Sequence, residues 1–191
     1  GIDPDVYTQI QRASLYFSSR LTADASAEGA RAVLEAHLLV AGAGELEAEP
    51  AKVRLLARVD NPLLIQVDPG VRSEALIEVL ETIDRLRSPG RVIVSLQPTG
   101  ADASQLAELV DGVASVRPGT TWVANPAVEL ASPGSGGAAG SVDGALARSR
   151  TESLSELVGA AGSHLAGFDL EVHTERLGDA PVVLAALGHD R

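Results

Sequence analysis

Three short apolar segments of the sequence each end in a polar residue that is followed by proline. These polar residues are Asp68, Gln97 and Asn125, and Thr99 and Asp102 follow the second segment closely. Carboxylate, amide and hydroxyl groups that meet in one place could bind a polar ligand or perform acid–base chemistry. Open parallel α/β sheets bind ligands at the carboxyl ends of their strands. If the three segments are parallel strands, the sequence predicts a ligand site at that edge, formed by Asp68, Gln97, Thr99, Asp102 and Asn125.

Turn chemistry is the simpler explanation of the same residues. Proline cannot continue a strand ladder and biases the residue before it away from the helical conformation, so a polar residue and proline together are a natural strand end. Asp, Asn and Thr are also common in turns and helix caps. Both interpretations stay open, and side chains that merely cap helices under packed loops would contradict the ligand site.

The histidines form weaker patterns. His173 alternates with Glu171 and Glu175, so a strand would place all three on one face, where they could bind a divalent ion or perform acid–base work. A solvated strand face explains this array as well. His37 falls on the apolar face of a predicted helix, and His164 falls near a predicted helix end. No two histidines have metal-ligand spacing, so we expect no metal and no cofactor.

Sequence motifs of nucleotide-binding proteins and of hydrolases are either absent or lack the secondary structure that they require. Residues 134–139 match the spacing of a dinucleotide-binding glycine motif. That motif requires a helix directly after it, whereas the next predicted helix begins more than ten residues later. The sequence contains neither a phosphate-binding P-loop nor the nucleophile elbow of the α/β hydrolases.

The charge of the chain excludes several classes of partner. Asp and Glu number 26 against 15 Lys and Arg, which gives a formal net charge of −11, and no basic run is present. Nucleic acids and anionic membrane surfaces are therefore not expected partners. The absence of cysteine excludes disulfides and thiol catalysis. No stretch approaches the roughly 20 apolar residues of a transmembrane helix, so we expect no membrane insertion within this chain.

The elements that would position the strand-end residues alternate regularly. Apolar strands are predicted over 63–67, 91–96 and 120–125, and amphipathic helices over 72–87 and 102–116. This alternation is typical of parallel strands joined by right-handed crossovers. The sequence thus predicts an α/β fold.

The flanking segments are predicted by the same criteria, and they complete a single domain over 1–191. We expect a three-layer domain with a mixed, largely parallel sheet of five or six strands. The further predicted elements are two helices (4–18 and 27–41) in an N-terminal helical element over 1–44, a strand over 52–59, a flexible Gly/Ser-rich loop over 132–148, a helix over 152–166, and a C-terminal β-hairpin (168–175 with 182–187).

The sequence favours a non-catalytic function. It has no recognisable catalytic constellation, an acidic surface and a flexible loop, which indicate an interaction or scaffolding domain with a protein partner. Abundant Ala, Gly, Val and Arg with a single lysine suggests a bacterial source. The chain starts without methionine, and we interpret it as excised from a membrane-anchored or envelope-associated protein.

Two alternatives to this function stay open. One is a small-ligand-binding protein or hydrolase that uses the strand-end site. The other is a relative of an α/β enzyme that kept the scaffold and lost the site.

Overall fold

The structure is a computed structural model that describes residues 9–10, 22–24, 31–33, 38–67, 70–97, 103–126 and 144–169. Its main feature is a six-stranded sheet in which the strands follow chain order, β1-β4-β5-β6-β7-β8. Every neighbouring pair is parallel. The strands are β1 (Gln9–Ile10), β4 (Leu38–Gly42), β5 (Leu63–Val67), β6 (Val92–Leu96), β7 (Thr121–Ala124) and β8 (Leu165–Phe168).

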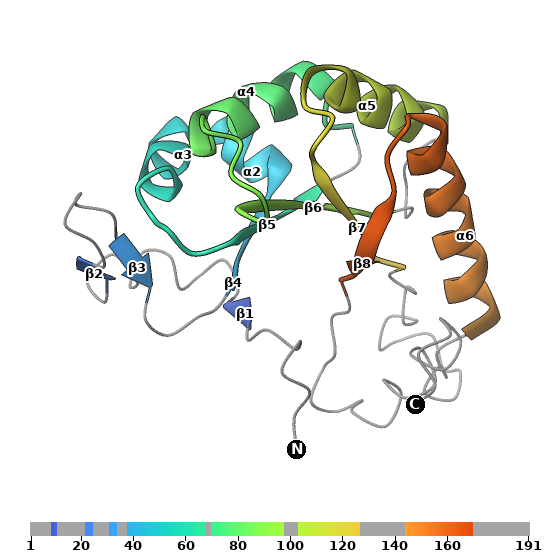
Figure 1. The fold of residues 1–191 in the computed structure, drawn as a ribbon, viewed down its shortest axis with the longest axis horizontal. Helices are drawn as coiled ribbons and strands as arrows, with labels where there is room; N and C mark the ends of the chain where they lie inside the picture. Colours follow the sequence, from blue (N-terminus) through green and yellow to red (C-terminus); the bar gives the residue numbers. More distant parts are fainter. Residues whose placement is uncertain are drawn as a thin grey trace, which may run out of the picture.

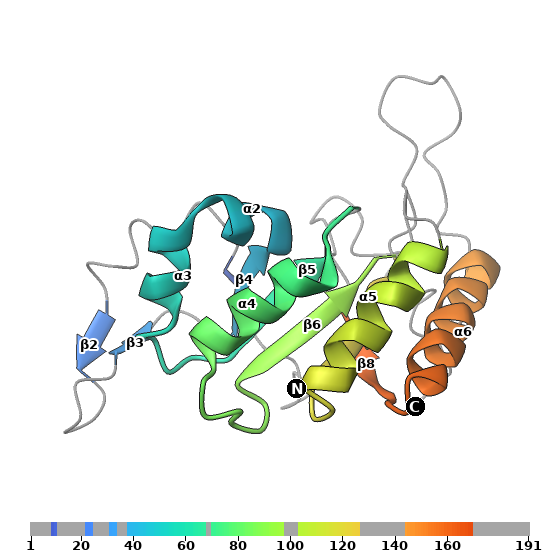
Figure 2. The same ribbon diagram turned by 90° about the horizontal axis from the view of Figure 1, so that it is seen from above.

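The described helices all cover one face of this sheet (Figure 1). Right-handed crossovers between strands in simple chain order place every connection on the same side, which is the arrangement of a (β/α) barrel wall. The helices are α2 (Ala43–Ala48), α3 (Pro50–Leu56), α4 (Ser73–Ile83), α5 (Ala103–Val116) and α6 (Gly144–Ala160). Seen from above in Figure 2, α4, α5 and α6 follow one another across the sheet, and each packs against the next. The predicted α/β class is confirmed, but helices on a second face are not found in the described part of the chain.

Strand alternation divides the apolar residues between two cores. The larger core lies between the sheet and the helices, and its fully buried members include Ile65, Val94 and Trp122. Residues on the opposite, concave face form a smaller cluster of Leu38, Val40, Leu64 and Val123, against which Ile93 packs. Both faces of the central strands are therefore buried, as the continuous apolar runs of parallel strands require.

One buried arginine joins the ends of two helices. Arg117 follows α5, and its guanidinium donates to the Asp84 carboxylate at 2.8 Å and to Glu81 Oε1 at 3.1 Å. It also donates to the backbone carbonyls of Leu80 and Asp84, both at 3.2 Å. Arg117 and Asp84 are 7% and 6% exposed. This ion pair therefore fixes the end of α4 against the end of α5, at the edge where the strands begin.

A second arginine closes the turn before β5. The guanidinium of Arg91 donates to the backbone carbonyls of Leu56, Val59 and Asn61. Burial lowers the pKa of Arg91, and the nearby Asp84 and Asp60 carboxylates oppose that shift. Its guanidinium thus joins the last residue of α3 to two backbone carbonyls of the segment that leads into β5.

The central elements agree with the sequence prediction. Strand β5 has the predicted bounds, and β6, β7, α4 and α5 all lie within the ranges predicted for them. Helix α6 begins at Gly144, inside the predicted loop, and ends at Ala160. The remainder of that loop (132–143) and all but the first two residues of the predicted C-terminal hairpin lie outside the described residues.

Two flanking predictions are wrong. The predicted strand over 52–59 is helix α3, because Pro50 starts a helix and the buried residues Val53 and Leu56 have helical spacing. The predicted helix over 27–41 is replaced by strand β4 and by β3 (Arg31–Val33), which pairs with β2 (Thr22–Asp24) in an antiparallel hairpin. All five residues of β4 are buried, so pairing with β5 outweighs the local helical pattern. Of the helix predicted over 4–18, the structure describes only Gln9–Ile10, which form strand β1.

We expect the substitution Arg117→Met to destabilise the fold by about 3–5 kcal/mol, because it leaves the buried Asp84 carboxylate without its cation. The matched control is Arg85→Met on an exposed side chain, for which about 0.5 kcal/mol or less is expected. Chemical denaturation measures both free energies of unfolding. Equal effects of the two substitutions would contradict the structural role of Arg117.

We also expect Gly112→Ala in α5 to destabilise the protein by about 1–3 kcal/mol, since the added carbon overpacks the contact with α4. A Cβ atom at Gly112 would lie 2.7 Å from the Cβ of Ser73. Gly159→Ala in α6 is the control, because nothing lies within 4 Å of its Cβ position. The control should stabilise the helix by about 0.5–1 kcal/mol in the same measurement. Destabilisation by both substitutions, or by neither, would be inconsistent with this packing.

Candidate functional site

Four polar side chains lie together on the concave side of the sheet, where the parallel strands end. Gln66 and Ser95 are register partners in β5 and β6. Ser95 also pairs with Val123, and Asn125 follows Val123 by two residues on the same face. Asp169 directly follows β8 and its backbone N–H donates to the carbonyl of Ala124 at 2.8 Å. Four consecutive strands thus each bring one polar residue to this edge.

The carboxylate of Asp169 is the common acceptor of the cluster. Its Oδ2 atom accepts hydrogen bonds from Ser95 Oγ at 2.8 Å, Gln66 Nε2 at 3.3 Å and Asn125 Nδ2 at 3.3 Å. Asp169 is 2% exposed, Ser95 is fully buried and Asn125 is 4% exposed, whereas Gln66 is half-buried. We name these four residues (Gln66, Ser95, Asn125 and Asp169) the strand-end cluster.

The strand-end cluster joins one negative charge to three uncharged donors. Hydrogen bonds to an ionised acceptor are stronger than neutral ones, and here they compensate part of the cost of burying the carboxylate. Because the donors come from β5, β6 and β7, Asp169 also fixes the relative positions of these strand ends. Of the four side chains, only the amide of Gln66 is half-buried, so it is the group of the cluster that a polar ligand at the mouth of the sheet could contact.

The structure describes two of the five residues that the sequence predicts as a ligand site. Asn125 belongs to the strand-end cluster, and Gln97 is half-buried two residues beyond Ser95. Asp68, Thr99 and Asp102 lie outside the described residues. Gln97 and Asn125 directly follow strands β6 and β7, and the five-residue ligand site itself stays a prediction.

Sequence reasoning missed Gln66, Ser95 and Asp169. A signal for them existed, because Gln66 and Ser95 are polar residues within otherwise apolar strands. A polar residue on the concave face, two positions after Leu64 or Ile93, must find a hydrogen-bond partner there. Asp169 is harder to recognise, since the sequence predicts the start of β8 as the end of a helix, and Phe168 and Asp169 as the start of a hairpin strand.

The weaker candidates lie away from this cluster or are not described. His164 is exposed just before β8, whereas His37, the array Glu171–Glu175 and the glycine motif at 134–139 lie outside the described residues. Within the described ranges, no group of three or more His, Asp or Glu side chains could hold a metal ion. No helix among the described residues is long and apolar enough to cross a membrane.

The only lysine of the sequence lies in the helical layer. Lys52 of α3 forms an ion pair with Glu45 of α2, and its side chain is 12% exposed. The ion pair between Lys52 and Glu45 thus joins the two consecutive helices α2 and α3.

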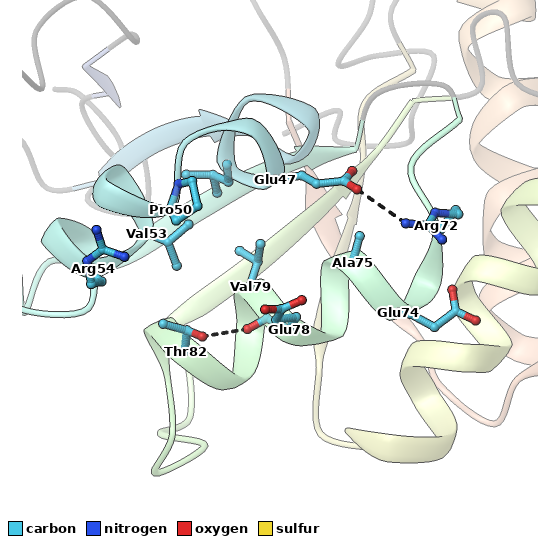
Figure 3. A pocket seen from close by; sticks show the side chains of 11 residues that line it. Glu47, Pro50, Val53, Arg54, Arg72, Glu74, Ala75, Glu78, Val79 and Thr82 are labelled. Atoms are coloured by element: carbon cyan, nitrogen blue, oxygen red, sulfur yellow. Dashed lines mark hydrogen bonds and ion pairs between the residues drawn. The ribbon is translucent and has the colours of Figure 1, made fainter.

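A separate pocket of about 430 Å³ opens between α2, α3 and α4 on the outer face (Figure 3). Glu47 extends across it toward Arg72, with which it forms an ion pair at 3.5 Å. The pocket shares no lining residue with the strand-end cluster. It is therefore a surface feature of the helical layer, and the chemistry of the strand ends does not extend into it.

Comparisons with known proteins identify relatives of the chain. Residues 3–180 match the Class-II DAHP synthetase family. The phospho-2-dehydro-3-deoxyheptonate aldolase of Streptomyces coelicolor is 26% identical over 134 residues, which cover 66% of this chain and 30% of that protein. The matched part of the chain thus corresponds to less than a third of the relative's length.

These relatives correct the function expected from the sequence. The prediction of a non-catalytic interaction or scaffolding domain of unknown function is wrong, because the match covers most of the chain and belongs to an enzyme family. The sequence contains no local catalytic motif that indicates an enzyme. In a barrel wall, the residues of a site come from the ends of several strands and share no motif.

We expect Asp169→Ala to destabilise the fold by about 3 kcal/mol, because it leaves the buried Ser95 hydroxyl and Asn125 amide without their acceptor. Asp169→Asn keeps the shape of the side chain and should cost about half as much. The control Asp111→Ala, at an exposed position of α5, should change the free energy of unfolding by about 0.5 kcal/mol or less. Urea titrations that gave the same value for all three variants would show that the cluster does not hold the strands together.

Proposed function

Because the chain belongs to the class-II DAHP synthetase family, we propose that it forms part of an enzyme site that makes or breaks a carbon–carbon bond of a keto sugar acid. The observation that carries this proposal is the strand-end cluster. It gathers a buried carboxylate and three hydrogen-bonding side chains at the carboxyl ends of parallel strands. In barrel enzymes, that edge is where active sites lie.

The name of the Streptomyces coelicolor relative specifies the chemistry that we propose for this site. A 2-dehydro-3-deoxy acid has a ketone at C2 and a methylene group at C3, so an aldolase acts on the bond between C3 and C4. In cleavage, the C4 hydroxyl loses its proton and the electrons of the C3–C4 bond pass to C3, as an enolate stabilised by the ketone. Protonation of C3 then completes a three-carbon keto acid and leaves a four-carbon aldehyde. Bond formation is the reverse.

Residues of the strand-end cluster fit the positioning tasks of this reaction. The half-buried amide of Gln66 carries donors and an acceptor, which suit a hydroxyl or a carbonyl group of the substrate, whereas the buried amide of Asn125 donates to Asp169. Asp169 acts as a positioning residue in this proposal, because its contacts fix the orientation of both amides. Preorganised donors of this kind stabilise charge that develops in the transition state.

The position of Lys52 constrains the mechanism. A lysine amine can activate a ketone by forming an imine. The single lysine of this chain is instead ion-paired with Glu45 between two outer helices. We therefore propose that hydrogen-bond donors of the strand ends, and no imine formed by this chain, polarise the substrate carbonyl.

Turnover of phospho-2-dehydro-3-deoxyheptonate by the full chain tests the proposal, with cleavage and formation followed by ¹³C and ³¹P NMR. We expect activity that Gln66→Ala lowers by about 10²-fold in kcat/KM, because the variant removes the half-buried amide donor of the cluster. The control Asp111→Ala should leave the rate unchanged.

A folded chain that shows no turnover would overturn the proposal. That result would support the alternative in which the chain keeps the scaffold of the family and has lost its chemistry.

A further inference from the structure

We infer that this chain forms a two-fold symmetric dimer in which Leu86 of each copy enters the outer pocket of the other. The outer pocket is the cavity of about 430 Å³ between α2, α3 and α4. The inference concerns the helical layer, so it goes beyond the proposed function and does not depend on it. Every residue on which it rests lies in the described part of the chain.

The floor of the outer pocket is apolar. It is lined by the buried side chains of Leu46, Val53 and Val79, one from each of the three helices. Concave sites with an apolar floor and a few polar groups at the rim are typical binding sites, because a ligand gains free energy by covering apolar surface. The occupant of this pocket must therefore bring an apolar group.

The α4 wall of the pocket is acidic. Helix α4 contains three glutamates and no basic residue. One of them, Glu81, is ion-paired with Arg87 and Arg117. The other two, Glu74 and Glu78, line the pocket and form no ion pair within the described ranges. Like charges one helical turn apart repel each other, so a cation beside Glu78 would relieve this repulsion.

The other charges at the pocket do not neutralise this wall. Arg72 is already ion-paired with Glu47 at one end of the pocket (Figure 3). Arg54 belongs to the α3 side. Among the residues that the structure describes, two carboxylates without an ion pair thus stand against one such guanidinium. The best occupant is therefore an apolar side chain with a cation next to it.

The turn after α4 has this combination of residues. Leu86 is 90% exposed, more than twice the exposed fraction of any other large hydrophobic residue in the described part of the chain. Arg85, the residue before it, is also exposed and forms no ion pair with another described residue. Insertion of Leu86 into an apolar pocket would remove its side chain from water, which stabilises a complex.

Hydrogen bonds hold this turn in one conformation. The Asp84 carboxylate accepts the backbone N–H of Ser88 at 2.9 Å and a guanidinium N–H of Arg117 at 2.8 Å. Arg87 has a φ of 51°, in the left-handed region, and its guanidinium donates to the last backbone carbonyl of α5 at 3.0 Å. Leu86 therefore lies on a rigid turn, and a preorganised contact residue loses little entropy on binding.

A second copy of the chain can use both features reciprocally. Thr82 lies between Glu78 and Arg85 in the sequence. A two-fold axis beside Thr82 would bring Arg85 of each copy to Glu78 of the other, with Leu86 at the pocket. Thr82 lines the pocket, is exposed and carries no charge, so the identical residues that meet at the axis do not repel each other. Because both copies use the same patch, association ends at the dimer.

Sedimentation equilibrium of the full chain tests this inference. We expect a monomer–dimer equilibrium with a micromolar dissociation constant, because two small contacts bury less surface than a standard interface. Leu86→Ser should weaken the dimer by about tenfold or more, since it removes the side chain that the pocket covers. The matched control Leu146→Ser, at another exposed leucine, should leave the dissociation constant unchanged.

A charge swap tests the pairing of Arg85 with Glu78. The substitutions Arg85→Glu and Glu78→Arg should each weaken the dimer by about tenfold, because each brings like charges together across the interface. The double variant should regain most of the lost affinity, since opposite charges then face each other again. A general loss of stability cannot produce this recovery.

A chain that stays monomeric up to about 1 mM would overturn the inference and leave the outer pocket to an occupant other than this chain. Association that Leu86→Ser leaves unchanged would overturn it as well, as would a double variant that dimerises no better than the single variants. None of these results depends on turnover, so failure of the dimer and failure of the proposed function are distinguishable.

Discussion

The carboxylate of Asp169 links four strands that are distant in the sequence. It reaches Gln66 across 103 residues, Ser95 across 74 and Asn125 across 44. Buried charges are costly unless they are well hydrogen-bonded, so the strand ends must be in register for this contact to form. The position of the polar edge, the orientation of its amides and its negative charge all follow from that one interaction.

The helical layer supports this edge from the other end. Arg117 and Arg91 satisfy carboxylates and carbonyls where the strands begin, and Gly112 allows α4 and α5 to approach closely. The two arginines thus stabilise the amino ends of the strands, whereas Asp169 joins their carboxyl ends, the edge at which the active sites of barrel enzymes lie.

The central part of the fold could be predicted from the sequence because its periodicity is strong. Strand β5 and helices α4 and α5 have apolar patterns that admit one interpretation, and turn residues mark their ends. The flanks were harder, since the short segments of β4 and α3 fit both helical and strand spacing. Pairing with neighbouring strands decides the case of β4, and the proline that begins α3 decides the other; strand pairing is not a local influence.

The same limit applies to the site. Asn125 could be predicted because a proline follows it at a strand end, but the partners that give it a role lie in other strands. Gln66 and Ser95 are single polar residues in apolar runs, and only the register of the sheet shows that they face one another. The family relationship corrected the function for a similar reason, since it draws on the whole chain and not on a local motif.

The central claim is that substrate binds at the strand-end cluster. Amide chemical shifts of the ¹⁵N-labelled chain, titrated with phospho-2-dehydro-3-deoxyheptonate, test it most directly. The account predicts saturable shifts centred on Gln66, Ser95, Asn125 and Asp169, with little change around the outer pocket between α2, α3 and α4. Shifts centred on Glu47 and Arg72 in that pocket, with the strand ends unperturbed, would contradict it.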